Sequence, residues 1–203
     1  MNKSLKYSLV FSQILFIALL PIWIKLTHYL HPIVIVIVWF CFTSLLVLIS
    51  LSISKKTISI SKPILNGITV FYSIGLLILL FFRPGNQSYG PQSINLIPFH
   101  TILFYFTSHI DLLIAFYNLA ANIGLFIPFG LYYCYVKNRP SVRHLIFITL
   151  FSIFVIEELQ YLTKRGSFDI DDIILNVLGV YFGYLIYPLL RKVVVIKTKL
   201  LAS

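Results

Sequence analysis

Long uninterrupted runs of apolar residues dominate this sequence and limit what the chain can fold into. A helix needs about 20 mostly apolar residues to cross a bilayer. The stretches that approach this length cover roughly 8–27, 33–53, 64–82, 112–136, 142–162 and 172–190. The chain is 59% hydrophobic and 11% charged, whereas soluble domains average about 45–50% and about 25%. The pattern therefore predicts an all-α, polytopic transmembrane helix bundle, and it excludes a soluble globular domain, a disordered chain and a disulfide scaffold.

Lysine and arginine residues favour one side of these expected spans. Most of them fall in the first, third, fifth and seventh segments outside the spans: Lys3, Lys6, Lys55, Lys56, Lys62, Lys137, Arg139, Arg143, Arg191, Lys192, Lys197 and Lys199. Because cytoplasmic segments carry an excess of basic residues, we expect six spans with both termini in the cytoplasm. The net charge of +10 then faces anionic lipid, and no nucleic-acid partner is expected.

Three regions are expected along the chain. Residues 1–82 form a three-span region without an assigned role, residues 83–190 hold a long outer loop and the last three spans, and residues 191–203 form a basic cytoplasmic tail. We interpret the first apolar stretch as a retained anchor, because no small-residue cleavage site follows it. Cys41 and Cys134 lie inside apolar runs and are interpreted as small packing residues, not as a disulfide pair.

The acidic residues gather where the spans are expected to face outward. There are six in the chain: Asp111, Glu157, Glu158, Asp169, Asp171 and Asp172. Glu157 and Gln160 are three residues apart and share a helix face, and Asn118 and Asn122 share another at a spacing of four. Acids inside a span are expensive to bury and indicate a functional site. For the two asparagines, hydrogen bonds between helices are the default interpretation, and contact with a ligand is the alternative.

The start of the last span combines polar and small residues on one helix face. Asp169 is placed as an N-cap, which explains acids near a helix N-terminus. Asp172, Asn176, Gly179 and Gly183 follow at spacings of four, three and four. Because a small-x-x-x-small pair lets another helix approach closely, we expect this face to point into the bundle and to carry Asp172 with it.

The longest connection runs from Arg83 to Asp111 on the expected outer side. It opens with the turn-rich sequence Arg83-Pro84-Gly85-Asn86 and later contains Asn95-Leu96-Ile97-Pro98-Phe99. A loop of this length is usually functional or ordered against another part of the protein. We expect it to lie on the membrane surface or to fold back over the bundle.

These elements together resemble the VanZ-like membrane proteins, a family named for a teicoplanin-resistance accessory protein. The resemblance covers roughly residues 83–190 and depends on the order Asn95-x-x-Pro98-Phe99, Asn118-x-x-x-Asn122, Phe126-x-Pro128-x-Gly130, Glu157-x-x-Gln160 and Arg165-x-x-x-Asp169-x-x-Asp172-x-x-x-Asn176-x-x-Gly179-x-x-x-Gly183. It implies a small multi-pass protein of the bacterial cell membrane, connected with susceptibility to a glycopeptide antibiotic that acts on the cell wall.

Two functional hypotheses of different classes follow. In the first, an outward-facing polar site binds a lipid, a lipid-linked cell-wall precursor or a glycopeptide antibiotic, with Arg165 pairing a phosphate or carboxylate. The candidate ligand-binding residues are Asn95, Asn118, Asn122, Glu157, Gln160, Arg165, Asp169, Asp172 and Asn176.

In the second hypothesis, the protein is a membrane enzyme that acts on an outer-leaflet lipid or wall precursor. Glu157 or Asp172 would be the general base, and Arg165 would stabilise an anionic transition state. A divalent metal held by Asp169, Asp171 and Asp172 is conceivable in this hypothesis, since hard cations prefer carboxylate oxygens, but no cofactor is expected for the protein. A transporter fits less well, since transport needs polar groups near the midplane and on both sides. A purely structural role, in which the polar residues pin the helix ends, is the remaining alternative.

Overall fold

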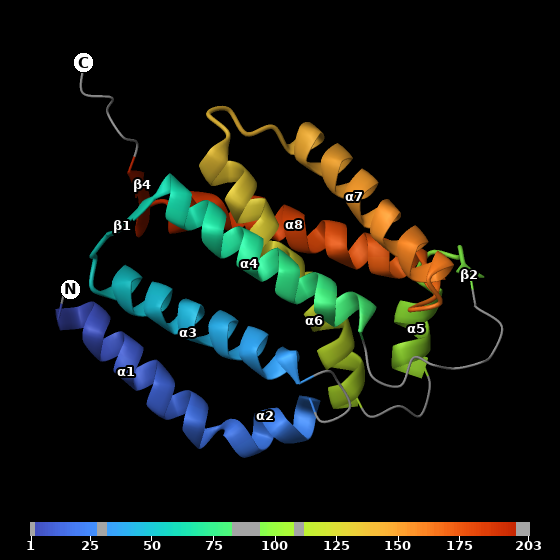
Figure 1. Cartoon of the computed structure of the whole chain (residues 1–203), viewed down its shortest axis with the longest axis horizontal. Coiled ribbons are helices and arrows are strands. Elements are labelled where there is room, and N and C mark those ends of the chain that lie inside the picture. The colour runs from blue at the N-terminus through green and yellow to red at the C-terminus, as the bar shows by residue number, and fades with distance from the viewer. Residues whose placement is uncertain (1–2, 28–31, 83–93, 108–111, 198–203) are drawn as a thin grey trace. The chain divides into compact units, whose positions relative to one another are not determined.

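The structure is a computed structural model that describes residues 3–27, 32–82, 94–107 and 112–197. The described part is built mainly from helices (Figure 1), and five of these are long and apolar enough to cross a membrane. They are α3 (Ile33–Ile53), α4 (Lys62–Phe81), α6 (Leu112–Val136), α7 (Val142–Leu162) and α8 (Ile170–Leu190). The predicted helical bundle of a multi-pass membrane protein is thereby confirmed. The turn at Arg83–Asn86 and Asp111 lie outside the described residues.

The first apolar stretch differs from the single helix that we expected over 8–27. It forms two helices, α1 (Lys3–Ala18) and α2 (Leu20–Thr27), with Leu19 between them. Pro21 accounts for the interruption, because proline lacks the N–H that would continue the helical ladder and its ring crowds the preceding turn. The Leu19 carbonyl instead accepts bonds from the N–H groups of Ile22 (3.0 Å) and Trp23 (3.1 Å). The number of spans and their orientation stay predictions.

The chain divides into two compact units, with boundaries inside α4 and α8. The N-terminal unit comprises residues 1–79 and 188–203. In it, α1 packs along α3 (Figure 1), and polar side chains join the two helices. Ser8 donates to Ser50 (2.5 Å), and Gln13 contacts both Thr43 (3.2 Å) and Trp39 (2.6 Å). Such bonds hold helices together where lipid supplies no hydrophobic driving force.

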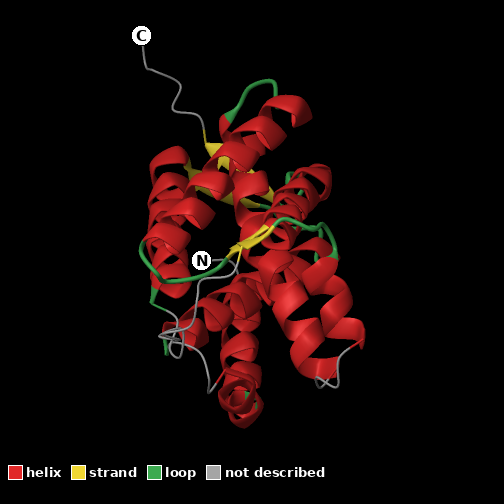
Figure 2. Ribbon diagram, turned by 90° about the vertical axis from the view of Figure 1, so that its right-hand side faces the viewer, coloured by secondary structure: helices red, strands yellow, loops and turns green. Residues whose placement is uncertain are grey.

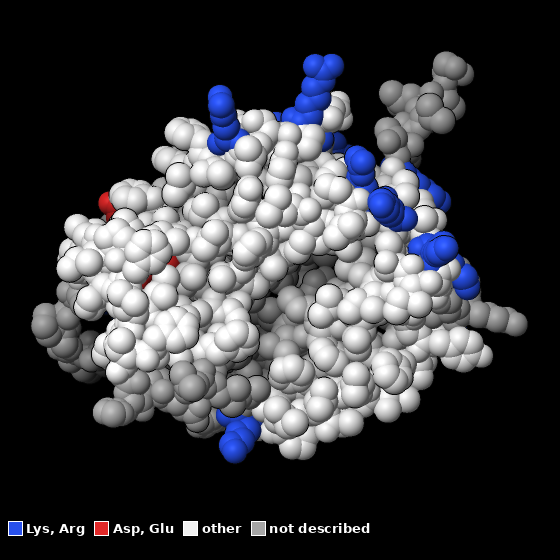
Figure 3. All heavy atoms as spheres, turned by 180° about the vertical axis from the view of Figure 1, so that it is seen from behind, with Lys and Arg blue, Asp and Glu red and all other residues white. Residues whose placement is uncertain are grey.

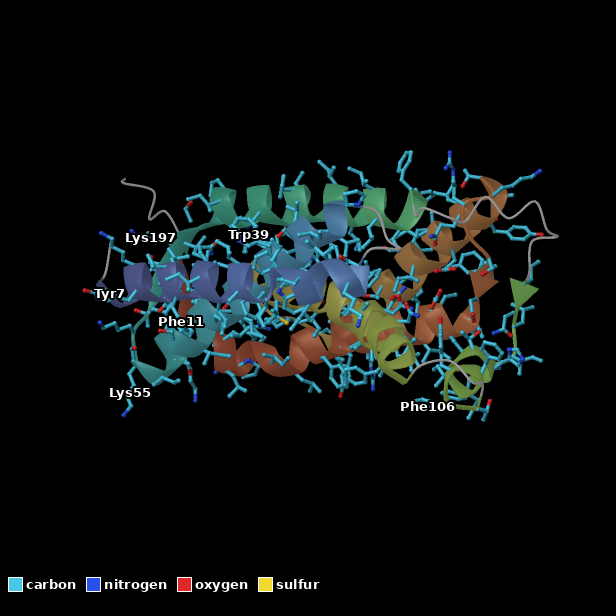
Figure 4. All side chains as sticks on the ribbon, turned by 90° about the horizontal axis from the view of Figure 1, so that it is seen from below. Tyr7, Phe11, Trp39, Lys55, Phe106 and Lys197 are labelled. Carbon is cyan, nitrogen blue, oxygen red and sulfur yellow. The ribbon has the colours of Figure 1, made fainter. Side chains whose placement is uncertain are left out.

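A short parallel sheet also belongs to the N-terminal unit and was not predicted. Strand β1 (Ile58–Ser61) pairs with β4 (Val194–Lys197), one of the two strand pairs shown in Figure 2. Strand β4 therefore lies within the segment expected to be a basic tail. Figure 4 shows Lys55 and Lys197 at the same end of this unit.

The central unit, residues 80–187, contains α5 (His100–Thr107), α6, α7 and most of α8. Its second parallel strand pair joins β2 (Ile94–Asn95) to β3 (Phe168–Asp169), so the long connection folds back onto the turn between α7 and α8. Pro128 lies within α6 without ending it. All the site residues predicted from the sequence belong to this unit.

Candidate functional site

Helices α6 and α8 of the central unit approach each other closely, and glycine makes this contact possible. A Cβ atom on Gly179 would overlap the Ile123 carbonyl oxygen, and one on Gly183 would overlap the Ile127 carbonyl oxygen. On the opposite helix, a Cβ on Gly130 would overlap the carbonyl oxygen of Val180. The prediction that this face of α8 points into the bundle is confirmed, and its partner is α6.

Above these glycines, the same two helices are joined by polar side chains. Asn122 on α6 donates from Nδ2 to Oδ1 of Asp172 on α8, at 2.6 Å. Asn118 lies one helical turn from Asn122 and is half-buried. The bond between Asn122 and Asp172 is charge-assisted, and such bonds are shorter and stronger than bonds between neutral groups. The structure thus brings Asp172 to the interface between α6 and α8.

Asn176 lies one turn beyond Asp172 on α8, and its hydrogen bonding is incomplete. The residue is 5% exposed. Its Oδ1 atom has no hydrogen-bond partner among the described residues. Buried polar atoms are nearly always paired, since an unpaired one keeps its desolvation penalty. An unpaired amide oxygen next to Asp172 therefore needs a further explanation.

Glu157 approaches the same place from α7. Its side chain is 4% exposed, accepts a hydrogen bond from the backbone of Asp169, and is close enough to Asp172 and Asp169 for their charges to interact. Gln160 lies on the same buried face of α7, and its amide donates to the Leu80 carbonyl at 2.9 Å. The structure therefore brings Glu157 and Asp172 together, whereas the Gln160 amide fastens the end of α4.

Asp169 and Asn95 connect the two strands of the short sheet. The Asn95 amide donates to Asp169 Oδ1 at 3.0 Å and to the Thr101 hydroxyl at 3.1 Å. The Thr101 hydroxyl donates in turn to Asp169 Oδ2 at 2.6 Å. Asp169 Oδ1 also accepts the Asp171 N–H at 2.9 Å, which confirms its predicted role as N-cap of α8. Both carboxylate oxygens of Asp169 are thus occupied by protein donors.

Asp171, the most deeply buried acid of the described residues, holds the N-terminus of α5. Its side chain is fully buried and accepts the backbone N–H groups of Phe99 (2.5 Å), Thr101 (2.8 Å) and Ile102 (3.1 Å). The first N–H groups of a helix have no partner within the helix, and a carboxylate there also interacts favourably with the helix dipole. Asp171 therefore caps a helix that begins about 70 residues earlier in the chain.

Sequence reasoning missed Asp171 and Thr101, and one local signal pointed to them. The residue before α5 is Phe99, which has no side-chain acceptor for the first N–H groups of the helix. Its backbone has a φ of +66°, a conformation that is rare outside glycine and asparagine. A short apolar helix without its own cap requires an acceptor from elsewhere, and the two carboxylate oxygens of Asp171 supply it.

The contact described for Arg165 is with an aromatic ring. Its backbone N–H bonds the Gln160 carbonyl (2.8 Å) and that of Lys164 bonds the Tyr161 carbonyl (3.1 Å), with Lys164 at a φ of +57°. This is a Schellman ending of α7. The exposed guanidinium lies 5.5 Å from the ring centroid of Phe82. On the face of the protein that Figure 3 shows, lysine and arginine side chains project outward, and aspartate and glutamate are visible only in small areas.

The described residues contain no group of three or more His, Cys, Asp or Glu side chains that could hold a metal ion. For Asp169 and Asp171, the reason is visible in the hydrogen bonds, because N–H and O–H donors already occupy their oxygens. Four polar side chains remain clustered between α6, α7 and α8: Asn122, Glu157, Asp172 and Asn176. We call this cluster the acid–amide site.

Comparison with known proteins shows the family of this chain. The family model described as VanZ/LLP1 matches residues 69–191, which is more than half of the chain and includes the whole acid–amide site. The chain belongs to the VanZ/LLP1 family. It is also 28% identical over 137 residues to "Protein VanZ" of Enterococcus faecium, across 64% of this chain and 78% of that protein. No solved structure matches the chain.

The VanZ/LLP1 match covers both the helices of the central unit and their buried polar groups. It begins within α4 and ends just after α8. It therefore covers β2, α5, α6, α7 and the glycine contacts of α8. The earlier helices α1, α2 and α3 lie outside it. This VanZ/LLP1 protein is therefore a multi-pass membrane protein whose family-specific part carries both the Asp171 cap and the acid–amide site.

Proposed function

We propose that this protein acts in the bacterial cell envelope by binding an amphiphilic ligand at the acid–amide site. The ligand classes are a lipid, a lipid-linked cell-wall precursor and a glycopeptide antibiotic, and the expected result of binding is a contribution to teicoplanin-type resistance. In the expected orientation the site lies at the outer ends of α6, α7 and α8. The observation that carries the proposal is the buried, unpaired Oδ1 of Asn176 beside two interacting acids.

A structural role alone does not require this arrangement. The contacts that pin helix ends are fully paired in Asp169 and Asp171, whose oxygens meet backbone and side-chain donors. In the acid–amide site, by contrast, Glu157 and Asp172 lie close together with an amide oxygen that lacks a donor. Because burying like charges and unpaired polar atoms is costly, the site is better suited to receive a ligand than to stabilise the empty protein.

The packing below the site supports binding over transport. Past Asn176, the face of α8 consists of Gly179 and Gly183 in direct backbone contact with α6. A solute cannot pass between helices whose backbones touch. The acid and amide groups of this face also end at Asn176, whereas transporters place their binding groups near the middle of the bilayer with access from both sides.

The experiment is a susceptibility assay with matched variants. The gene is expressed in a host that lacks it, teicoplanin susceptibility is measured, and the amount of protein in the membrane is quantified. We expect Asp172→Asn to reach wild-type levels and to lose the resistance effect, since it keeps size and most hydrogen bonding but removes the charge. Glu158→Gln is the control, because it changes an exposed acid next to Glu157.

Two results would count against the proposal. If Asp172→Asn reaches wild-type levels and keeps the full effect, the site does not carry the function. If the effect is lost only in proportion to lost protein, the cluster is structural. The enzymatic alternative is distinguished by the fate of the ligand: binding returns it chemically intact after incubation with the purified protein, whereas catalysis converts it.

A further inference from the structure

Helix α5 and the residue before it expose large apolar side chains. Leu103 is 58% exposed and Phe106 is 62% exposed, and Phe99, directly before the helix, is 54% exposed. Figure 4 shows Phe106 at the edge of the central unit. The segment from residue 94 to residue 107 contains no aspartate, glutamate, lysine or arginine. An apolar surface of this kind marks contact with another protein or with a membrane.

The remaining sides of α5 are polar or packed against the unit. His100 and Thr107 are both exposed and lie two turns apart, so they share a side that differs from the side of Leu103 and Phe106. Thr101 and Tyr105 are half-buried and lie one turn apart on the side toward the rest of the unit. Helix α5 is therefore amphipathic, with separate apolar, polar and packed sides.

The Asp171 cap determines where these sides lie. The N–H groups of Thr101 and Ile102, in the first turn of α5, donate to the Asp171 carboxylate in the first turn of α8. Because α8 is long and apolar enough to cross a membrane, its first turn lies near one boundary of the bilayer. Figure 1 shows α5 running across the end of α8, not alongside it. Helix α5 is therefore held at the membrane boundary, in an orientation that follows the plane of the bilayer.

The apolar side of α5 continues the surface that the long helices present to lipid. At the same end of the unit, Phe116 near the start of α6 is 70% exposed and Leu162 at the end of α7 is 65% exposed. Helix α5 has eight residues and is therefore about 12 Å long, too short to cross the hydrocarbon core of about 30 Å. Its length suits a helix that lies in one leaflet.

We propose that α5 is an interfacial membrane helix, with Phe99, Leu103 and Phe106 inserted among the acyl chains and with His100 and Thr107 at the headgroups. Helices of this class sink about 5–10 Å into the boundary between headgroups and acyl chains. In the expected orientation this is the outer leaflet. Because Asp171 joins α5 to α8, the depth of α5 sets the depth at which α8 begins. The inference does not depend on ligand binding at the acid–amide site.

The test measures the depth of a fluorescent NBD label in the full-length protein, reconstituted in phosphatidylcholine vesicles. The label is attached to Leu103→Cys or Phe106→Cys, in a background with Cys41→Ala and Cys134→Ala. The quenchers are phosphatidylcholines with a nitroxide on the headgroup, on the upper acyl chain or near the chain end, and aqueous iodide on both sides of the membrane. We expect the upper-chain nitroxide to quench both labels several-fold more than the chain-end nitroxide or iodide does.

Three positions calibrate the measurement. Phe151→Cys places the label on a side chain in α7 that is 67% exposed, and the chain-end nitroxide should quench it most. Asn138→Cys places it in the exposed turn between α6 and α7, and iodide should quench it most. Thr107→Cys, on the polar side of α5, should respond most to the headgroup nitroxide. If the background variant does not accumulate, Cys134 is retained, since it is 2% exposed, and its own labelling is measured and subtracted.

Two results would overturn the interfacial helix. If iodide quenches the labels at Leu103 and Phe106 as strongly as the label at Asn138, the apolar side of α5 lies in water. If neither iodide nor any nitroxide reaches these labels, protein covers that side, and a disulfide-linked dimer of Phe106→Cys would identify a second copy as the cover. Neither result bears on the resistance assay, which tests the acid–amide site separately.

Discussion

Alanine in place of Gly179 or Gly183 is the sharpest test of how α6 and α8 pack. At each position, the added Cβ would overlap a backbone carbonyl oxygen of α6, that of Ile123 for Gly179 and that of Ile127 for Gly183. A carbonyl oxygen within a helix cannot rotate away as a long side chain can. The methyl group is therefore accommodated only if the two helices separate along their whole contact.

The magnitude follows from two opposed effects. Overpacking a tight interface costs about 1–3 kcal/mol, and the upper end applies because the obstacle is backbone. Replacing glycine by alanine in a helix returns up to about 1 kcal/mol. The net loss is therefore about 2 kcal/mol for each substitution, which corresponds to a fall in unfolding midpoint of roughly 4–8 °C for a protein of this size.

The assay is thermal unfolding in detergent, followed by size-exclusion chromatography. Gly124→Ala is the matched control, because it lies on α6 and a Cβ there would meet nothing within 4 Å. We expect this variant to unfold at the wild-type temperature or slightly above it. Unchanged midpoints for both Gly179→Ala and Gly183→Ala would refute the backbone contact, and an equal fall in Gly124→Ala would show that the loss is not specific to it.

Three further predictions concern the turn between α7 and α8 and the topology. Asp171→Asn should weaken the three backbone bonds to α5 by about 3 kcal/mol in total. Hydrogen exchange of the Phe99, Thr101 and Ile102 amides should therefore become about 100-fold faster. Unchanged exchange rates would contradict the role of Asp171 as a cap. Lys164→Gly should stabilise the protein by about 0.5–1 kcal/mol in detergent unfolding, because a residue with a side chain is strained at positive φ, and Lys164→Ala should not. A reporter active only outside the cell should be silent at Ser203 and active after Asn86; an active Ser203 fusion on an intact chain would overturn the orientation.

Local patterns in the sequence determined the class of the protein and several details of its packing. Span length and hydropathy follow from the composition of each segment alone, so the five long helices were predictable. The face formed by Asp172, Asn176, Gly179 and Gly183 was predictable as well, because helix geometry sets which residues share a side. The N-cap at Asp169 depends on residues within one turn. Each of these features requires only neighbours along the chain.

The tertiary structure decided which groups meet across long sequence separations. Asp171 caps α5, Gln160 fastens the end of α4, and β1 pairs with β4. No local periodicity encodes these partners, because a carboxylate or an amide satisfies its hydrogen bonds equally well with any donor or acceptor that the fold brings near. The break at Leu19 required the fold too, since proline is tolerated in some membrane helices and interrupts others, as Pro128 and Pro21 show here.

In the acid–amide site, too, some features were predictable from the sequence and others depended on the tertiary structure. The sequence alone indicated that Asp172 and Asn176 belong to an inward-facing side of the last span, because small residues continue the same face, and that Glu157 shares a face with Gln160. Whether each atom has a partner is a property of the packed protein. The packed helices pair Asp172 with Asn122, leave Asn176 Oδ1 without a donor, and place Arg165 over Phe82. Hydrogen bonding depends on distances of a few tenths of an ångström, which only the tertiary structure supplies.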